Sequence, residues 1–156
     1  MDILFLHGLE SGPMGTKARW FSSRWKTVIP ALPTPDFHAC VQLAAQELAH
    51  HSPRLLVGSS YGGAIAQLLL ERGDWRGPTL LIAPAGEKLG LSVHSPEGVP
   101  ILVLHGDQDE VIPLQDSIRY CTAQSVSLQV IIGGDHRLNA LLENGVMEAA
   151  VRRFLG

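Results

Sequence analysis

Ser60 lies at the centre of the stretch Gly-Ser-Ser-Tyr-Gly, residues 58–62, which fits the pattern G-x-S-x-G. A short apolar run precedes this stretch, and a segment rich in Ala and Leu follows it. Between a buried strand and a buried helix, this pattern predicts a sharp turn that exposes one hydroxyl, and its glycines avoid collisions there. The register makes Ser60 the predicted nucleophile and Ser59 a filler position. The alternative is a small-residue turn that serves packing alone.

A serine hydroxyl is a poor nucleophile at neutral pH unless a base removes its proton. Among the seven histidines, His136 follows the last apolar run in the Gly-rich loop GGDHRL, and we predict that it is the base. His7 and His105 each close an apolar run before a glycine, where packing or local hydrogen bonding is the commoner role. The other four have no context that supports a base: His38, His50, His51 and His94.

The base in turn needs a carboxylate that holds its tautomer and stabilises the imidazolium. The candidates are Asp107, Asp109, Glu110 and Asp135. Asp135 adjoins His136, and neighbours in a loop rarely face each other well. Chain spacing alone does not separate Asp107 from Asp109.

Apolar runs and helical segments alternate along the whole chain. The predicted strands cover residues 3–7, 27–32, 55–59, 79–83, 101–105 and 128–134, and the predicted helices cover 17–26, 37–51, 61–72, 113–123 and 138–154. Because the runs are apolar without alternation, they predict an α/β fold with six mainly parallel strands and helices on both faces. Ligands bind beyond the carboxyl ends of such strands. Ser60, both aspartates and His136 follow three of the predicted strands.

The composition bounds the class of protein. The 156 residues predict one domain, residues 1–156, and the net charge of −3 gives no electrostatic case for binding nucleic acid or an anionic membrane. No apolar run reaches the ~18 residues of a membrane span, and Asp2 stands where a signal peptide needs basic residues. These features predict a cytoplasmic protein. Cys40 and Cys121 form no spacing motif and are expected to be free thiols, and no motif predicts a metal or another cofactor.

The stretch HGDQDEVIP, residues 105–113, resembles H-G-x-x-D-x-x-V-P of the α/β-hydrolase superfamily. That resemblance implies that Asp109 is the acid of a triad with Ser60 and His136. The opening LHGLESGPMGTKA is similar to the L-H-G-F-x-S-S-P-x-S-x-K-A opening of small lidless bacterial esterases. This chain departs from that opening at Leu9 and Gly12. These two differences are expected to affect the acyl pocket and to leave the triad unchanged.

Acyl transfer builds negative charge on the carbonyl oxygen, and backbone N–H groups stabilise it. We expect these donors to be the N–H of Tyr61, after the nucleophile, and the N–H of Leu9, in the loop after the first strand. Trp20, Phe21 and Trp25 have helical spacing, which favours a place in the core over one in the acyl pocket. Glu10 and Lys17 are candidates either to form an ion pair or to order the loop.

Only residues 84–99 separate the fourth and fifth predicted strands, too few for a folded lid. An open site favours small soluble esters. The sequence therefore predicts a serine carboxylesterase with an acyl-enzyme intermediate and a small-molecule ester substrate. A thioesterase or an amidase would use the same residues, and a binding protein that had lost turnover is the alternative from another class. The acyl and alcohol groups and the oligomeric state are left open.

Overall fold

A computed structural model describes all 156 residues. Its six strands form one sheet in the order β2-β1-β3-β4-β5-β6, and every neighbouring pair is parallel. The strands are β1 (Ile3–Leu6), β2 (Thr27–Val28), β3 (Leu55–Ser59), β4 (Thr79–Ile82), β5 (Ile101–Gly106) and β6 (Val126–Ile131). The predicted α/β fold and its six strands are confirmed, and the sheet is parallel throughout.

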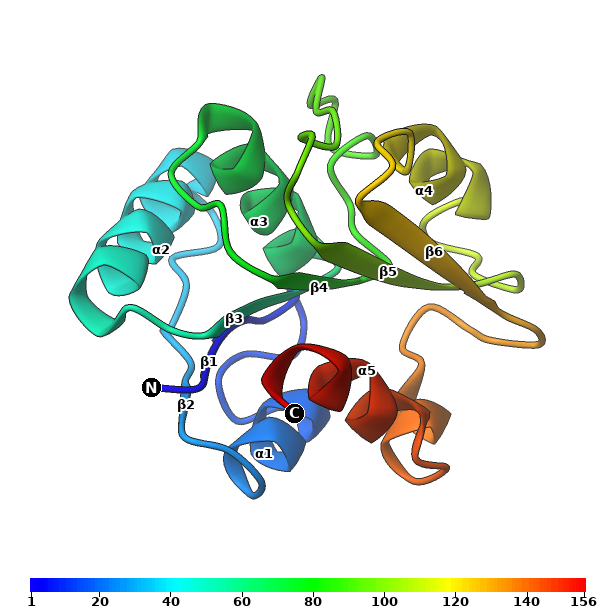
Figure 1. Cartoon of the computed structure of the whole chain (residues 1–156), viewed down its shortest axis with the longest axis horizontal. Helices are drawn as coiled ribbons and strands as arrows, with labels where there is room; N and C mark the ends of the chain where they lie inside the picture. The colour runs from blue at the N-terminus through cyan, green and yellow to red at the C-terminus, as the bar shows by residue number, and fades with distance from the viewer.

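Helices cover both faces of the sheet (Figure 1). The helices are α1 (Thr16–Ser22), α2 (Phe37–His51), α3 (Tyr61–Arg72), α4 (Leu114–Tyr120) and α5 (Val146–Leu155), with a short 3₁₀ helix η1 (Asn139–Leu142). One hydrophobic cluster joins the sheet to α2, α3 and α4, and a second joins it to α1, η1 and α5. The two clusters explain why the central strands are apolar on both faces.

The order of the strands creates a switch point between β1 and β3. From β1 the chain moves outward to β2, and it then returns to place β3 on the other side of β1. The connections after β1 and β3 therefore diverge to opposite faces of the sheet, which leaves a crevice beyond their carboxyl ends. The Gly-Ser-Ser-Tyr-Gly stretch follows β3, and the loop that contains Leu9 follows β1.

Several predicted boundaries were wrong, including the end of the helix predicted for 113–123, which spans Leu114–Tyr120 (α4). The second strand pairs only over Thr27–Val28, and Pro30 lies beyond it. The first helix ends at Ser22 instead of residue 26, and β6 spans 126–131 instead of 128–134 and ends before Gly133, whose φ is 73°. The single helix predicted for 138–154 is instead η1 and α5, separated at Gly145 with φ 84°. Positive φ favours glycine and interrupts a regular element.

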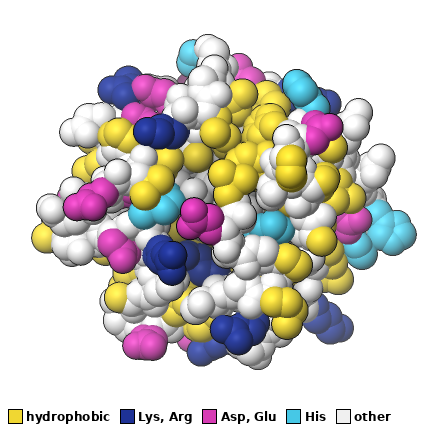
Figure 2. Space-filling model, turned by 180° about the vertical axis from the view of Figure 1, so that it is seen from behind, with side chains coloured by type: hydrophobic (Ala, Val, Ile, Leu, Met, Phe, Trp, Pro, Cys, Tyr) yellow, Lys and Arg dark blue, Asp and Glu magenta, His cyan; other side chains and the backbone are white.

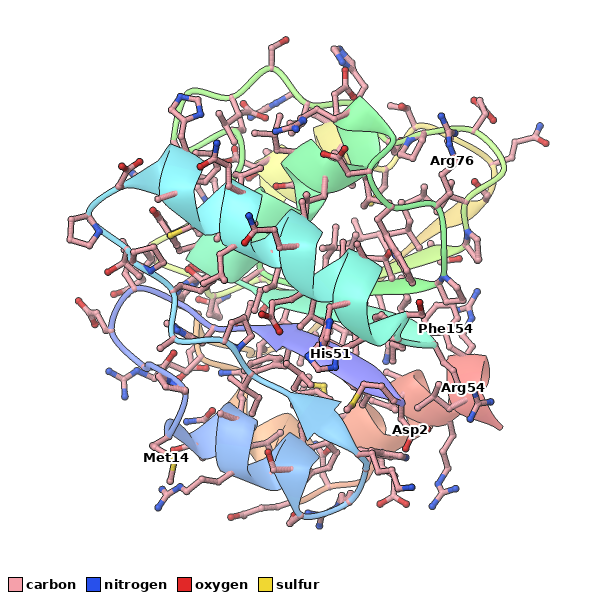
Figure 3. All side chains as sticks on the ribbon, turned by 90° about the vertical axis from the view of Figure 1, so that its left-hand side faces the viewer. Asp2, Met14, His51, Arg54, Arg76 and Phe154 are labelled. Carbon is pink, nitrogen blue, oxygen red and sulfur yellow. The ribbon has the colours of Figure 1, made fainter.

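The two ends of the chain meet at the amino ends of the strands. Arg54 lies 3.7 Å from the Asp2 carboxylate and donates a 3.1 Å hydrogen bond to the carbonyl of Leu155, next to Phe154 (Figure 3). These contacts tie β1, β3 and α5 together at the end of the sheet opposite the crevice. Met14, in the loop after β1, points away from the body of the protein.

The connection between β4 and β5 contains no helix or strand, so no lid is inserted there. None of the helices has the length and apolar character that crossing a membrane would require. On the face in Figure 2, acidic and basic side chains are interspersed and form no continuous area of one charge.

Candidate active site

Ser60 occupies the turn between β3 and α3 in a conformation that few non-glycine residues adopt, with φ 55° and ψ −111°. Its own N–H donates to the carbonyl of Ile82 at 2.9 Å, and its carbonyl accepts from the N–H of Ala85 at 3.0 Å. These two bonds to the end of β4 hold the strained turn in place. Strain of this kind persists only where the surrounding structure enforces it.

Two glycines allow the turn to pack so closely. A Cβ at Gly62 would collide with the carbonyl oxygen of Leu6 in β1. A Cβ at Gly58 would lie 2.6 Å from the carbonyl oxygen of Gly62. The predicted G-x-S-x-G pattern therefore has a steric cause here, because the start of α3 rests directly on β1 and β3.

His136 lies beyond β6, and its Nε2 is 2.9 Å from Ser60 Oγ. The loop that presents it is anchored by Leu138, which is buried in the cluster beneath α1 and α5. Asp135 fixes the same loop, since its carboxylate accepts a 2.8 Å hydrogen bond from the Leu138 N–H. Asp135 therefore shapes the loop that carries His136 instead of contacting the imidazole.

Of the two aspartates that chain spacing left open, Asp109 contacts the histidine. Its Oδ2 lies 2.8 Å from His136 Nδ1, and its side chain is fully buried. Its Oδ1 accepts hydrogen bonds from the N–H groups of Val111 and Ile112 at 2.9 and 2.8 Å. Asp107 instead accepts from the N–H of Gly133 at 2.7 Å.

His105 also contacts this site, whereas its position before a glycine predicts only packing or local hydrogen bonding. Its Nε2 lies 2.9 Å from the carbonyl of Ile112 and 3.2 Å from Asp109 Oδ2. Its Nδ1 lies 2.6 Å from the hydroxyl of Ser117, so a tautomer with the proton on Nε2 satisfies every contact. The i, i+4 spacing of His105 and Asp109 across the end of a strand was the available signal.

Two backbone N–H groups near Ser60 are free. Tyr61 is the first residue of α3 and therefore has no acceptor within the helix for its N–H. The N–H of Leu9 has no acceptor in the chain. His7 orders the loop of Leu9, since its Nδ1 lies 2.8 Å from the carbonyl of Gly8 and its Nε2 accepts from the Leu32 N–H at 3.2 Å.

A cavity of about 420 Å³ opens at this end of the sheet. The residues that line it include Leu9, Lys17, Ser60, Val111, His136 and Arg137. The side chains of Leu9 and Val111 are exposed at its walls and make them partly apolar.

The aromatic residues of α1 and the segment after it lie elsewhere. Trp20, Phe21 and Trp25 pack against the core cluster beneath the sheet and do not line the cavity. Phe21 is fully buried, and Trp20 donates a hydrogen bond from Nε1 to the carbonyl of Leu142 at 3.0 Å. Their helical spacing therefore reflects a place in the core.

Lys17 extends from α1 into the cavity wall. It is half-buried and donates a 3.2 Å hydrogen bond to Asn139 Oδ1. Burial lowers the pKa of Lys17 from its usual value to about 8, against the opposing attraction of Asp135. Glu10 lines the same cavity but does not form the expected ion pair with Lys17.

The two cysteines lie apart in the fold. Cys40 is buried, with its sulfur 3.8 Å from the hydroxyl of Tyr61, and burial raises its pKa. Burial also raises the pKa of Cys121, to about 11, and both thiols are free. No cluster of three or more His, Cys, Asp or Glu side chains is arranged to hold a metal ion.

No protein-family model matches the sequence, and no curated protein matches it significantly. Solved structures do match. A protein from Xanthomonas campestris assigned to the hydrolases of the alpha/beta superfamily superposes with a TM-score of 0.78 at 26% identity, over 99% of this chain and 96% of that one. Est1E from Butyrivibrio proteoclasticus superposes with a TM-score of 0.74 at 18% identity, over 98% of this chain and 86% of that one.

An alpha-beta serine hydrolase homologue from Coxiella burnetii also has a TM-score of 0.74 at 18% identity, over 97% of this chain and 84% of that one. The match to each of the three covers nearly the whole chain. The parallel sheet with helices on both faces lies within the matched part. The protein therefore has the fold of the α/β-hydrolase superfamily.

Proposed function

We propose that this protein is a serine hydrolase that cleaves small carboxylic esters through an acyl-enzyme. The observation that carries the proposal is the series of two hydrogen bonds from Ser60 Oγ to His136 Nε2, 2.9 Å, and from His136 Nδ1 to Asp109 Oδ2, 2.8 Å. Both distances lie within the reach required of a nucleophile, its base and the group that orients the base. Structural neighbours that are named hydrolases support the same class of reaction.

In the proposed acylation, Ser60 Oγ attacks the ester carbonyl carbon and its proton passes to His136 Nε2. The carbonyl oxygen becomes negative and accepts hydrogen bonds from the free N–H groups of Leu9 and Tyr61. Asp109 holds the Nδ1–H of His136 and stabilises the imidazolium. The carbon–oxygen bond to the alcohol then breaks, and His136 returns the proton to the departing oxygen.

Deacylation repeats these roles with water as the nucleophile. His136 removes a proton from the water as its oxygen attacks the acyl carbon, and the same two N–H groups stabilise the oxyanion. The bond to Ser60 Oγ then breaks, and the proton returns from His136 to the serine. A carboxylic acid leaves, and the protein regains its starting protonation state.

A fluorophosphonate tests the proposal directly, because it reacts with an activated serine far faster than with an ordinary hydroxyl. Intact mass after treatment is expected to show one adduct on the wild type and none on Ser60→Ala. Ser59→Ala is the matched control, since Ser59 is the adjacent serine and also lines the cavity, whereas the hydrogen bond to His136 comes from Ser60. It is expected to keep the adduct.

The absence of an adduct on folded wild-type protein would contradict the proposal and favour a binding protein on this fold. If the adduct forms, para-nitrophenyl esters of rising chain length, matched thioesters and matched amides then separate an esterase from a thioesterase and an amidase. The esterase proposal expects the highest kcat/KM on the esters.

A further inference from the structure

Lys17 is a cation without a counterion in the wall of the cavity that contains Ser60. Its ammonium group donates to the neutral amide oxygen of Asn139, and no carboxylate lies within ion-pair distance of it. An ammonium has three N–H donors, so two remain without a protein partner. Burial without a counterion is costly for a charged group, and the lowered pKa of Lys17 reports that cost.

The neighbouring charges leave the cavity wall net positive. Arg137 lines the same wall and forms no ion pair. Glu10 is the only carboxylate in the wall, and it is exposed. Asp135 attracts Lys17, but its carboxylate already accepts from the Leu138 N–H and it does not line the cavity.

We propose that the ester cleaved at Ser60 carries a carboxylate, which forms an ion pair with Lys17 in this cavity. The inference rests on the proposed function, because it names the substrate class of the same site. The substrate's carboxylate accepts hydrogen bonds from the two N–H donors of Lys17 that have no acceptor in the protein. Arg137 adds to the positive potential, and the apolar side chains of Leu9 and Val111 contact the hydrocarbon part of the substrate.

Binding to Ser60→Ala tests the inference without turnover. Isothermal titration compares monoethyl adipate with its primary amide, in which the acyl side carries the charge or lacks it. A second pair, γ-acetoxybutyrate and its primary amide, places the same difference on the alcohol side. The acid of at least one pair is expected to bind about tenfold more tightly than its amide, as hydrogen bonds to charged groups contribute.

Substitutions then assign the preference to Lys17. Lys17→Met in the Ser60→Ala background is expected to remove it, and Lys17→Gln, which keeps an N–H donor without the charge, is expected to remove most of it. Lys88→Met is the matched control, because Lys88 is exposed outside the cavity and the net charge changes equally. Glu10→Gln is expected to strengthen the preference, since it removes the negative charge from the wall.

Equal binding of acid and amide in both pairs, or no detectable binding of either acid, would overturn the inference. A preference that survives in folded Lys17→Met, checked by its melting curve, would overturn it as well. The proposed function is measured separately, by the fluorophosphonate adduct and by hydrolysis of neutral esters on the wild type. If the wild type forms the adduct and hydrolyses neutral esters but binds acid and amide equally, the proposed function is retained and the proposed substrate class is rejected.

Discussion

His105 Nε2 lies 3.2 Å from Asp109 Oδ2, the same oxygen that lies 2.8 Å from His136 Nδ1. Both His105 and the Asp109 carboxylate are fully buried. The aspartate therefore has an imidazole on each side, one from β5 and one from the loop after β6. His105 fixes the position of the carboxylate from within the sheet, while His136 approaches from the cavity.

His105→Phe is expected to lower kcat by about tenfold, because Asp109 loses one charge-assisted contact and holds His136 less firmly. His105→Gln is expected to recover part of the rate, since its amide N–H reaches toward the same oxygen. The readout for positioning is a fall in kcat with an unchanged KM, because His105 is buried and does not line the cavity. An unchanged kcat in both folded variants would assign His105 to packing alone.

Asp109→Asn is expected to reduce kcat by a factor on the order of 10⁴, because the amide favours the wrong tautomer of His136. Asp107→Asn is the matched control, since this aspartate bonds to the N–H of Gly133 and not to His136. Steady-state kinetics on a para-nitrophenyl ester measure both variants. A larger loss in Asp107→Asn would transfer the role of the acid to that residue.

Leu9→Pro is expected to reduce kcat by about 10²–10³, because it removes one proposed oxyanion donor. Leu9 is exposed and its N–H has no acceptor in the chain, so the substitution breaks no hydrogen bond of the fold. Leu9→Ala retains the N–H and is expected to retain most of the rate. If the proline and alanine variants lose activity equally, the Leu9 side chain matters and its N–H does not.

Lys17→Met is expected to raise the melting temperature at pH 7. The pKa of Lys17 is about 8 in the folded protein and near its usual 10.5 in the unfolded chain, so the unfolded chain binds more protons between these values. The free energy of unfolding of the wild type therefore rises with pH between about 8 and 10.5. Below pH 8 the charged Lys17 destabilises the folded state by its full amount. Asp135, Arg137, Glu10 and His136 are the charged or titratable neighbours, and all are retained in the variant.

The difference in melting temperature between Lys17→Met and the wild type is expected to shrink as the pH approaches 10.5. Calorimetric melts at several pH values measure it, with Lys88→Met as the control for the loss of one exposed positive charge. A Lys17→Met protein less stable than the wild type at pH 7 would mean that the bond to Asn139 outweighs the cost of the buried charge.

The fold was predictable because the four central strands, β1, β3, β4 and β5, are apolar runs without alternation, as expected of a sheet covered on both faces. Boundaries were less predictable where a single residue decides them, as Gly145 does when it divides η1 from α5. The turn at Ser60 was predictable because its glycines are required sterically within the local sequence. The contact of His105 with Asp109 was not, because its distance depends on how the chain turns after β5.

The loop of His136 begins at β6, which is an edge strand paired with β5 alone. Ser60, by contrast, follows β3, which is hydrogen-bonded on both sides. Opening of the β6 edge alone is expected to separate His136 from Ser60 while the pairs among the other five strands stay formed. The reactivity of Ser60 would then fall before any signal averaged over the whole sheet, so it reports locally on the pairing of β5 with β6.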